Sequence, residues 1–174
     1  MMNSGQPTSE SERAYIALGS NLGDSVQILL EAMKRLAELS AQPLLRSSLW
    51  ATSPVDCPPG SPDFVNAVVG LAPLPGETPE SLLVRLQALE QEFGRRPKVV
   101  MNEPRPLDLD IIVFGNELRD SAQLVLPHPR AHLRRFVMAP LAEIASELVL
   151  PRAQHKVGEL LSALDSGEVI RRLE

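Results

Sequence analysis

Apolar positions follow two different periods along this chain and so predict both strands and helices. Four short apolar runs, bounded by glycine, proline or polar residues, are typical of β-strands. They cover residues 14–20, 44–52, 64–72 and 107–115.

Helical spacing predicts two helices between these strands. The first covers 24–39 and has Asp24 as its N-cap. The second begins at Thr78 and Pro79, an N-cap followed by proline at the first helical position, and ends at Gly94. The predicted buried face of the first helix is Val26, Leu29, Leu30, Met33 and Ala37. The predicted stripe of the second helix is Leu82, Leu86, Leu89 and Phe93.

The order of these elements is β-α-β-β-α-β. It predicts an α+β fold, a ferredoxin-like βαββαβ sandwich with two helices on one face of an antiparallel sheet. Weaker helical patterns near 135–146 and 156–164 predict a C-terminal helical extension. We expect a flexible N-terminal tail over 1–12 and a single domain over 13–174.

Composition narrows the class of protein. The chain has 174 residues, of which 44% are hydrophobic, and this suits one globular domain. The single Cys57 excludes an internal disulfide, and no apolar run is long enough to span a membrane. The polar, acidic start MMNSGQPTSESE lacks the features of a signal peptide. A net charge of −5 argues against a general nucleic-acid or membrane-surface binder, so we expect a soluble, cytoplasmic protein.

The charge is reversed locally. Residues 94–135 hold eight basic and five acidic side chains, a net +3, so the remainder of the chain carries −8. A basic segment in an acidic protein is typical of a site for a small polyanion, although a solvated loop would have the same composition.

Two carboxylates are the sharpest chemical feature of the sequence. In a strand, Asp108 and Asp110 lie on one face, whereas Leu107, Leu109, Ile111 and Val113 lie on the other. Carboxylate oxygens suit Mg²⁺, which takes one or two carboxylates together with substrate phosphates and water. The alternative is a solvent-facing strand edge that happens to carry two aspartates, a residue that strands disfavour.

Basic side chains flank the aspartates and could bind phosphates. Arg105 lies three residues before Asp108, and Arg95, Arg96 and Lys98 follow the second predicted helix. Guanidinium groups match phosphate oxygens, but a salt bridge from Arg105 to Asp108 or a solvated loop remains an alternative. His128, between two prolines, is a candidate nucleotide contact or a structural histidine.

Three further side chains suit a flat heterocycle. Phe64 and Asn66 share one face of the third strand, where a ring can stack and an amide can read an edge. Phe136 could supply the opposite wall, although both phenylalanines could also be ordinary core. The stretch GSNLGD lacks the Lys-Ser/Thr of a phosphate-binding loop, so its glycines more simply permit a tight turn close to a ligand.

Taken together, these residues resemble the 6-hydroxymethyl-7,8-dihydropterin pyrophosphokinases of folate biosynthesis. The stretches that carry the resemblance run from about residue 14 to 151, and PR-x-LDLDI with LPHPR downstream is specific among them. The matching stretches are AYIALGSNLGD, SSLWATSPV, DFVNAVV, LEQEFGRRPK, PRPLDLDI and LPHPRAHLRRFVMAPL.

The resemblance implies a ferredoxin-like fold and transfer of pyrophosphate from ATP to the pterin hydroxymethyl oxygen, releasing AMP. It implies that Asp108 and Asp110 hold two Mg²⁺ ions and that Arg95, Arg105 and Lys98 serve the triphosphate. The implied ATP contacts are Gln87, Glu90, Arg95, Arg105, Ile111, His128 and Arg134. The implied pterin contacts are Thr52, Val55, Phe64, Asn66 and Phe136.

Two other classes share the topology. An RNA-binding module would need exposed aromatic residues on a basic sheet, whereas aromatic residues are 3% of this chain and the candidate face carries two aspartates. A non-catalytic regulatory domain that binds a small ligand would have no use for an aspartate pair beside basic residues. We therefore expect an enzyme with ATP and the pterin as partners, without nucleic acid or membrane, as a monomer or weak dimer.

Overall fold

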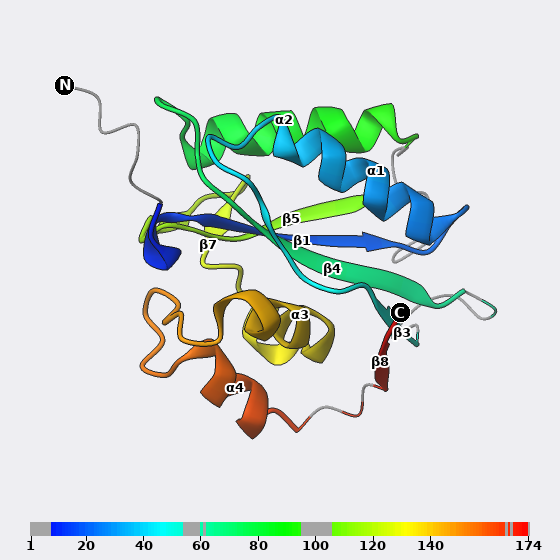
Figure 1. Cartoon of the computed structure of the whole chain (residues 1–174). Coiled ribbons are helices and arrows are strands. Elements are labelled where there is room, and N and C mark those ends of the chain that lie inside the picture. The colour runs from blue at the N-terminus through cyan, green and yellow to red at the C-terminus, as the bar shows by residue number, and fades with distance from the viewer. Residues whose placement is uncertain are drawn as a thin grey trace.

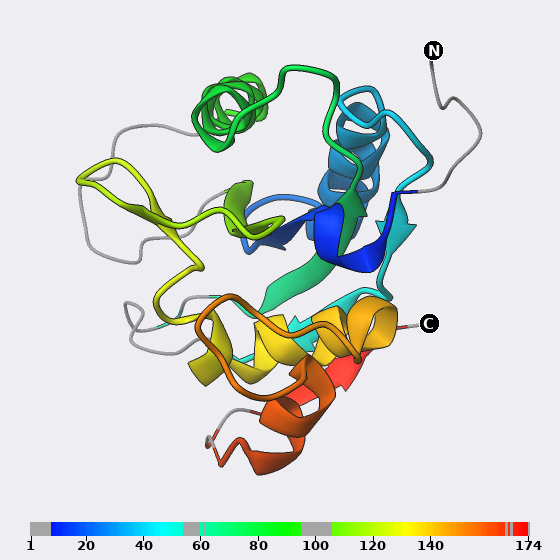
Figure 2. The ribbon, with the colours of Figure 1, turned by 90° about the vertical axis from the view of Figure 1, so that its left-hand side faces the viewer.

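The fold is described from a computed structural model, which covers residues 8–53, 60, 62–94, 106–165, 167 and 169–173. One antiparallel sheet lies between two helical layers, as the two views of the ribbon show (Figures 1 and 2). α1 (Ser25–Ala37) and α2 (Pro79–Glu92) cover one face, and α3 (Arg135–Ala145) and α4 (Val157–Ala163) lie on the other side. The predicted α+β fold with an antiparallel sheet is confirmed, and the C-terminal helices supply its third layer.

β1 (Ala14–Ser20) is an inner strand of the sheet. It pairs antiparallel with β4 (Phe64–Leu71) on one side and with β5 (Asp108–Phe114) on the other. The full order is β5-β1-β4-β3-β8, where β3 is Trp50–Thr52 and β8 is Ile170–Arg172. The C-terminal strand β8 was not predicted, because three residues are too few for a recognisable alternation.

The strand predicted over 44–52 is wrong in its continuity. The structure has β2 (Leu45–Arg46) and β3, both paired with β4, separated by an irregular segment. The reason lies at Ser47, whose Oγ accepts a hydrogen bond from Val68 N at 2.9 Å in place of a ladder carbonyl. A side chain that replaces a backbone partner interrupts the regular pairing.

The predicted buried face of α1 is partly wrong. Asp24 does cap the helix, accepting a hydrogen bond from Gln27 N at 3.3 Å. However, Val26 and Leu30 are 40% and 39% exposed, and Ala37 is exposed as well. The face that meets the sheet consists of Leu29, Ala32, Met33 and Leu36. The sequence carries two adjacent apolar stripes on this helix, and only the position of the sheet decides which one is buried.

The prediction for α2 is confirmed. Thr78 Oγ1 accepts a hydrogen bond from Ser81 N at 3.1 Å, Ser81 Oγ accepts one from Thr78 N, and Pro79 is the first helical residue. Gly94 has a φ of +93°, a left-handed conformation that favours glycine at the end of a helix. The leucines of the predicted stripe, Leu82, Leu86 and Leu89, are buried.

The sheet separates two hydrophobic cores, one on each of its faces. One core joins α1 and α2 to Ile16, Leu18 and other side chains of one face. The second joins α3 and α4 to the opposite face, through Tyr15 and Val68. The face that carries Asp108 and Asp110 is therefore partly covered by α3, which a sandwich with helices on one face alone would have left open.

A β-bulge changes the face of Val113. β1 pairs Tyr15 with Val113 but Ile16 with Ile111, so Ile112 is an extra residue in β5. Val113 consequently packs in the second core, whereas Leu107, Leu109 and Ile111 lie in the first as predicted. The extra residue is apolar like its neighbours, so the sequence pattern could not locate it.

Short elements complete the fold. Residues Glu10–Glu12 (η1) and Ala131–Leu133 (η2) form 3-10 helices, and β6 (Arg119–Asp120) pairs with β7 (Val125–Leu126). The η1 turn lies inside the segment predicted as a tail, and the buried Tyr15 donates its hydroxyl to Glu10 O at 3.0 Å. Among the described residues, no helix has the length and apolar character needed to cross a membrane.

Candidate active site

A row of four residues crosses the sheet on the face that carries α3. β1 pairs Gly19 with Asp108 of β5 and with Asn66 of β4, and β4 pairs Asn66 with Trp50 of β3. Directly paired residues of neighbouring strands point to the same face. We call Asp108, Gly19, Asn66 and Trp50 the central row. It joins a predicted metal ligand to a predicted pterin contact across three adjacent strands.

Gly19 puts no side chain into the middle of the central row, and neighbouring side chains lie close to its backbone. A Cβ atom placed on this residue would lie 3.1 Å from Oδ1 of Asn66 and 3.8 Å from Cδ1 of Phe64. Neighbouring strands are about 4.8 Å apart, so the Cα atoms of Asp108 and Asn66 are separated by about 10 Å. No side chain of β1 therefore stands between these two polar groups, and the Asn66 amide lies close to the Gly19 backbone. Gly19 lies near the end of β1, as the strand predicted over 14–20 expected, and the turn predicted for the GSNLGD stretch follows it.

The predicted pterin contacts of β3 and β4 lie together. Thr52 pairs with Phe64 across the strands, and Asn66 Nδ2 donates a hydrogen bond to Thr52 Oγ1 at 2.6 Å. Asn66 and Thr52 are both buried, 4% exposed each. A buried amide fixed by a hydroxyl has one defined orientation, which suits recognition of a flat ring by its polar edge.

Asp108 and Asp110 are half-buried on the same face as the central row, where Asp110 pairs with Ala17. Their oxygens are hard ligands, and the neighbouring β1 positions carry only a glycine and an alanine, which leaves space above the strand. These residues thus fit Mg²⁺ held by one or two carboxylates together with substrate oxygens. No group of three or more metal-ligating side chains occurs among the residues the structure describes.

His128 lies beside this face and is held by main-chain contacts. Its main-chain N–H donates a hydrogen bond to Ile112 O at 2.8 Å, and its ring Nδ1 accepts one from Arg130 N at 3.1 Å. Burial, and then the positive charges of Arg134 and Arg130, lower its pKa to about 4, against the opposing charge of Asp108. The ring is therefore neutral near pH 7, and the bond to Nδ1 assigns its proton to Nε2.

The predicted nucleotide contacts on α2 and β5 differ in how far their side chains are exposed. Glu90 is buried and its Oε2 accepts a hydrogen bond from Leu109 N at 2.7 Å, between the two aspartates. Gln87, one turn earlier, is exposed. Ile111 is buried in the first core, so any contact that it makes to a ligand goes through its main chain.

The start of α3 brings two further predicted contacts together. The guanidinium carbon of Arg134 lies 5.5 Å from the centre of the Phe136 ring, within the range of a cation–π contact. Phe136 is half-buried and packs against the second core. Arg134 is the N-cap residue of α3, so the pair lies where the helix begins.

Four predicted site residues lie outside the described part of the chain. They are Val55, Arg95, Lys98 and Arg105. Their roles at the pterin and the triphosphate remain predictions.

Two residues at this site were missed by the sequence analysis. Trp50 belongs to the central row, and the period of two from Thr52 could have placed it on the same face. Glu143 of α3 hydrogen-bonds to Trp50, a contact that joins residues 93 positions apart and that no local pattern indicates.

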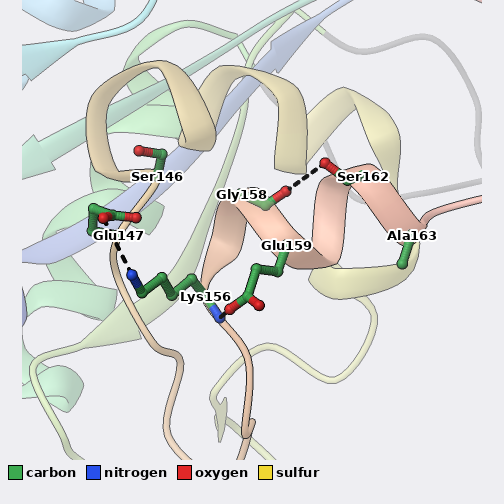
Figure 3. A pocket seen from close by; sticks show the side chains of 7 residues that line it. All are labelled: Ser146, Glu147, Lys156, Gly158, Glu159, Ser162 and Ala163. Carbon is green, nitrogen blue, oxygen red and sulfur yellow. Dashed lines mark hydrogen bonds and ion pairs between the residues drawn. The ribbon is translucent and has the colours of Figure 1, made fainter.

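A separate hollow lies between the end of α3 and α4, and no residue of the central row lines it. It is lined by side chains at the end of α3 and along α4, including the ion pair of Glu147 and Lys156 at 3.2 Å (Figure 3). α4 lies beyond α3 from the sheet, so the hollow is on the side of α3 that faces away from the sheet (Figures 1 and 2).

Comparisons with known proteins show what this chain is similar to. The sequence profile described as 7,8-dihydro-6-hydroxymethylpterin-pyrophosphokinase (HPPK) matches residues 15–146. A 2-amino-4-hydroxy-6-hydroxymethyldihydropteridine pyrophosphokinase of Haemophilus influenzae is 45% identical over 144 residues, covering 81% of this chain and 86% of that protein. The protein of the same description from Pseudomonas aeruginosa is 41% identical over 155 residues, covering 87% and 91%.

Solved structures show the same fold. A crystal structure of an HPPK-DHPS protein in complex with substrates superimposes with a TM-score of 0.69 at 11% identity. The match covers 87% of this chain and 44% of that one. The chain thus spans less than half the length of that larger protein.

Proposed function

Because the chain belongs to the 7,8-dihydro-6-hydroxymethylpterin-pyrophosphokinase family, we propose that the face of the sheet bearing the central row is its catalytic surface. The enzyme is an ATP-dependent pyrophosphokinase of folate biosynthesis that transfers pyrophosphate to the hydroxymethyl group of 6-hydroxymethyl-7,8-dihydropterin. The hydroxymethyl oxygen forms a bond to the β-phosphorus, and the bond from that phosphorus to the oxygen of the α-phosphate breaks, releasing AMP. A non-catalytic regulatory domain is no longer a competing interpretation.

One observation carries the assignment of the surface. Asp108 and Asn66 occupy the same row, about 10 Å apart by strand spacing, and Gly19, which has no side chain, lies between them. A phosphate group beside Asp108 and a pterin edge at Asn66 would then bring the hydroxymethyl group over Gly19. Phosphoryl transfer needs mainly such positioning, together with neutralisation of charge.

We assign the nucleotide to the Asp108 end of the row. Asp108 and Asp110 would hold Mg²⁺, which when bound neutralises phosphate charge and orients the transferring group. The neutral ring of His128 can donate a hydrogen bond from Nε2 to the nucleotide without adding a charge. Arg95, Arg105 and Lys98 are proposed to bind the phosphates, and Gln87, Glu90, Ile111 and Arg134 to complete the ATP site.

We assign the pterin to the Asn66 end. The amide of Asn66, oriented by Thr52, would read the polar edge of the ring, and Phe64 would stack on one face of it. Phe136 of α3 would form the opposite wall, with Val55 contributing from the segment before β4. A neutral bicycle held by stacking needs both walls in place, so we propose that MgATP binds first and completes the pocket.

Calorimetry tests the nucleotide and pterin assignments separately. A nonhydrolysable ATP analogue is titrated into the protein with and without Mg²⁺, and the pterin is titrated with and without the MgATP analogue. We expect the analogue to need Mg²⁺ and the pterin to bind tightly only to the nucleotide complex. Pterin should in turn tighten the analogue by the same factor, because coupling between sites is reciprocal.

An asparagine pair separates the pterin assignment from general damage. Asn66→Ala should weaken the pterin by roughly tenfold or more, since polar groups of the ring lose their partner, and should leave ATP affinity without pterin unchanged. Asn116→Ala, in an exposed turn, is the matched control. Wild-type pterin affinity in the Asn66 variant would overturn the pocket, and equal pterin affinity with and without nucleotide would overturn the binding order.

A further inference from the structure

We infer that Glu143 of α3 is a positioning residue for the pterin pocket: it ties β3, the three-residue strand between β4 and β8 that carries Trp50 and Thr52, to the helix that carries Phe136. The inference rests on the proposed pterin assignment and adds a residue to it from outside the site. It concerns how the two walls are held at a fixed separation.

The carboxylate of Glu143 makes contacts to both ends of one short segment. Its Oε1 accepts a hydrogen bond from Trp50 Nε1 at 2.6 Å and one from Ser48 N at 3.2 Å. Its Oε2 accepts one from Ser48 Oγ at 2.8 Å. An indole, a main-chain amide and a hydroxyl thus converge on one ionised group, and hydrogen bonds to a charged acceptor are stronger than neutral ones.

The contact with Glu143 lies where it can fix the position of β3 in the sheet. Regular pairing with β4 is interrupted between Arg46 and Trp50, and Glu143 supplies a partner for the Ser48 amide within that gap. β3 resumes with Trp50 opposite Asn66 and Thr52 opposite Phe64. A shift of this three-residue strand would therefore move the groups that orient the amide of Asn66.

The helix side of the contact leads to the other wall. Phe136 and Glu143 are seven residues apart in α3, two helical turns, and so lie on the same side of the helix. Glu143 is the only acidic residue of that helix. A single side chain thus couples the place of β3 to the helix that presents Phe136, in the layer below the sheet (Figure 1).

The contact is at the surface, which separates its role from global stability. Glu143 is exposed, and polar contacts of exposed groups add little to the free energy of unfolding. Loss of the carboxylate should therefore loosen β3 locally while the two hydrophobic cores keep the fold. Local order at Trp50 and pterin affinity should change together, and the melting temperature should change little.

Trp50 supplies a direct readout because it is the only tryptophan of the chain. Fluorescence of the ligand-free protein is measured in the wild type, Glu143→Ala and Glu143→Gln, with Glu147→Ala as matched control. Glu147 is exposed and pairs with Lys156, away from the sheet. We expect stronger quenching of Trp50 by a soluble quencher and lower anisotropy in Glu143→Ala, smaller changes in Glu143→Gln, and none in Glu147→Ala.

The same variants are then titrated with pterin in the presence of the MgATP analogue. Glu143→Ala should raise the pterin dissociation constant by about tenfold and leave the affinity for the analogue alone unchanged. Trp50→Phe keeps an aromatic ring but removes the Nε1 donor. The double variant should lose less than the sum of the two single losses, because both remove one shared contact.

The outcomes distinguish this inference from the proposal beneath it. Wild-type protein that fails to bind pterin would overturn the pocket assignment and the inference with it. Normal pterin binding in the wild type and equal binding in Glu143→Ala would overturn the inference alone. So would equal losses for pterin and nucleotide accompanied by a lower melting temperature, since that result marks a general structural residue.

Discussion

Gly19 and Asn66 sit opposite one another on adjacent strands, and a methyl group on Gly19 would lie 3.1 Å from Oδ1 of Asn66. Because Gly19 has no side chain, the Asn66 amide lies close to the backbone of β1 at this point. Any side chain at this position would fill the space between the predicted metal ligands and the predicted pterin contact.

Gly19→Ala should therefore impair binding more than folding. The added methyl group presses on the Asn66 amide and occupies the surface beside it, so we expect pterin affinity to fall by about tenfold or more. Gly167→Ala is a matched control, because a Cβ at Gly167 has no heavy atom within 4 Å. Calorimetry and thermal melting of both variants check this, and unchanged pterin affinity in Gly19→Ala would contradict it.

Removing either aspartate charge should abolish turnover and leave the fold intact. Asp108→Asn and Asp110→Asn keep the shape of the side chain but remove the charge that would hold Mg²⁺, so kcat should fall by roughly a thousandfold. Both residues are only half-buried, so the melting temperature should change little. The exposed Asp120→Asn, on β6, should behave as the wild type. Near-normal kcat in either site variant at ordinary Mg²⁺ would refute the metal assignment.

His128 should make the protein less stable in mild acid. The unfolded chain takes up a proton at histidine near pH 6.5, whereas the pKa of His128 in the folded protein is lowered to about 4. The unfolded state therefore binds more protons between these values, and this contribution to stability is lost as pH falls from about 6.5 to about 4. Denaturant titrations of the wild type and His128→Gln across this range check the effect.

The His128→Gln variant should show a flatter loss of stability over that pH range. His132→Gln, which changes an exposed histidine, should keep the wild-type profile. Identical pH profiles for the wild type and His128→Gln would show that another group controls the acid response.

Glu90 and Gln87 both belong to the proposed ATP site, but only the substitution of the buried Glu90 should also lower the free energy of unfolding. Glu90→Ala removes the acceptor of the buried Leu109 amide and should cost about 1–3 kcal/mol of unfolding free energy. Because Leu109 lies between the two aspartates, we also expect a lower kcat. Gln87→Ala changes an exposed side chain and should weaken the ATP analogue without a change in stability. Chemical denaturation and calorimetry measure both quantities, and the reverse pattern would exchange the two roles.

Much of this architecture could be predicted from the sequence, because local rules decide it. Thr78, Pro79 and Gly94 set the limits of α2 by capping chemistry that needs no tertiary contact. Strand alternation likewise placed Asp108 and Asp110 together on one face. The motif around them was specific enough to indicate the family before any fold was known.

Tertiary structure decided the features that depend on partners far along the chain. The buried stripe of α1 was set by the sheet, because both apolar stripes satisfy helical periodicity. The bulge at Ile112 and the break at Ser47 arise from pairing between strands, which adjacent residues do not encode. Glu143 meets Trp50 across 93 positions for the same reason. Sequence by itself determined which strand positions share a face, and tertiary packing decided what holds those groups in place, since contacts between distant residues exist only after the chain has folded.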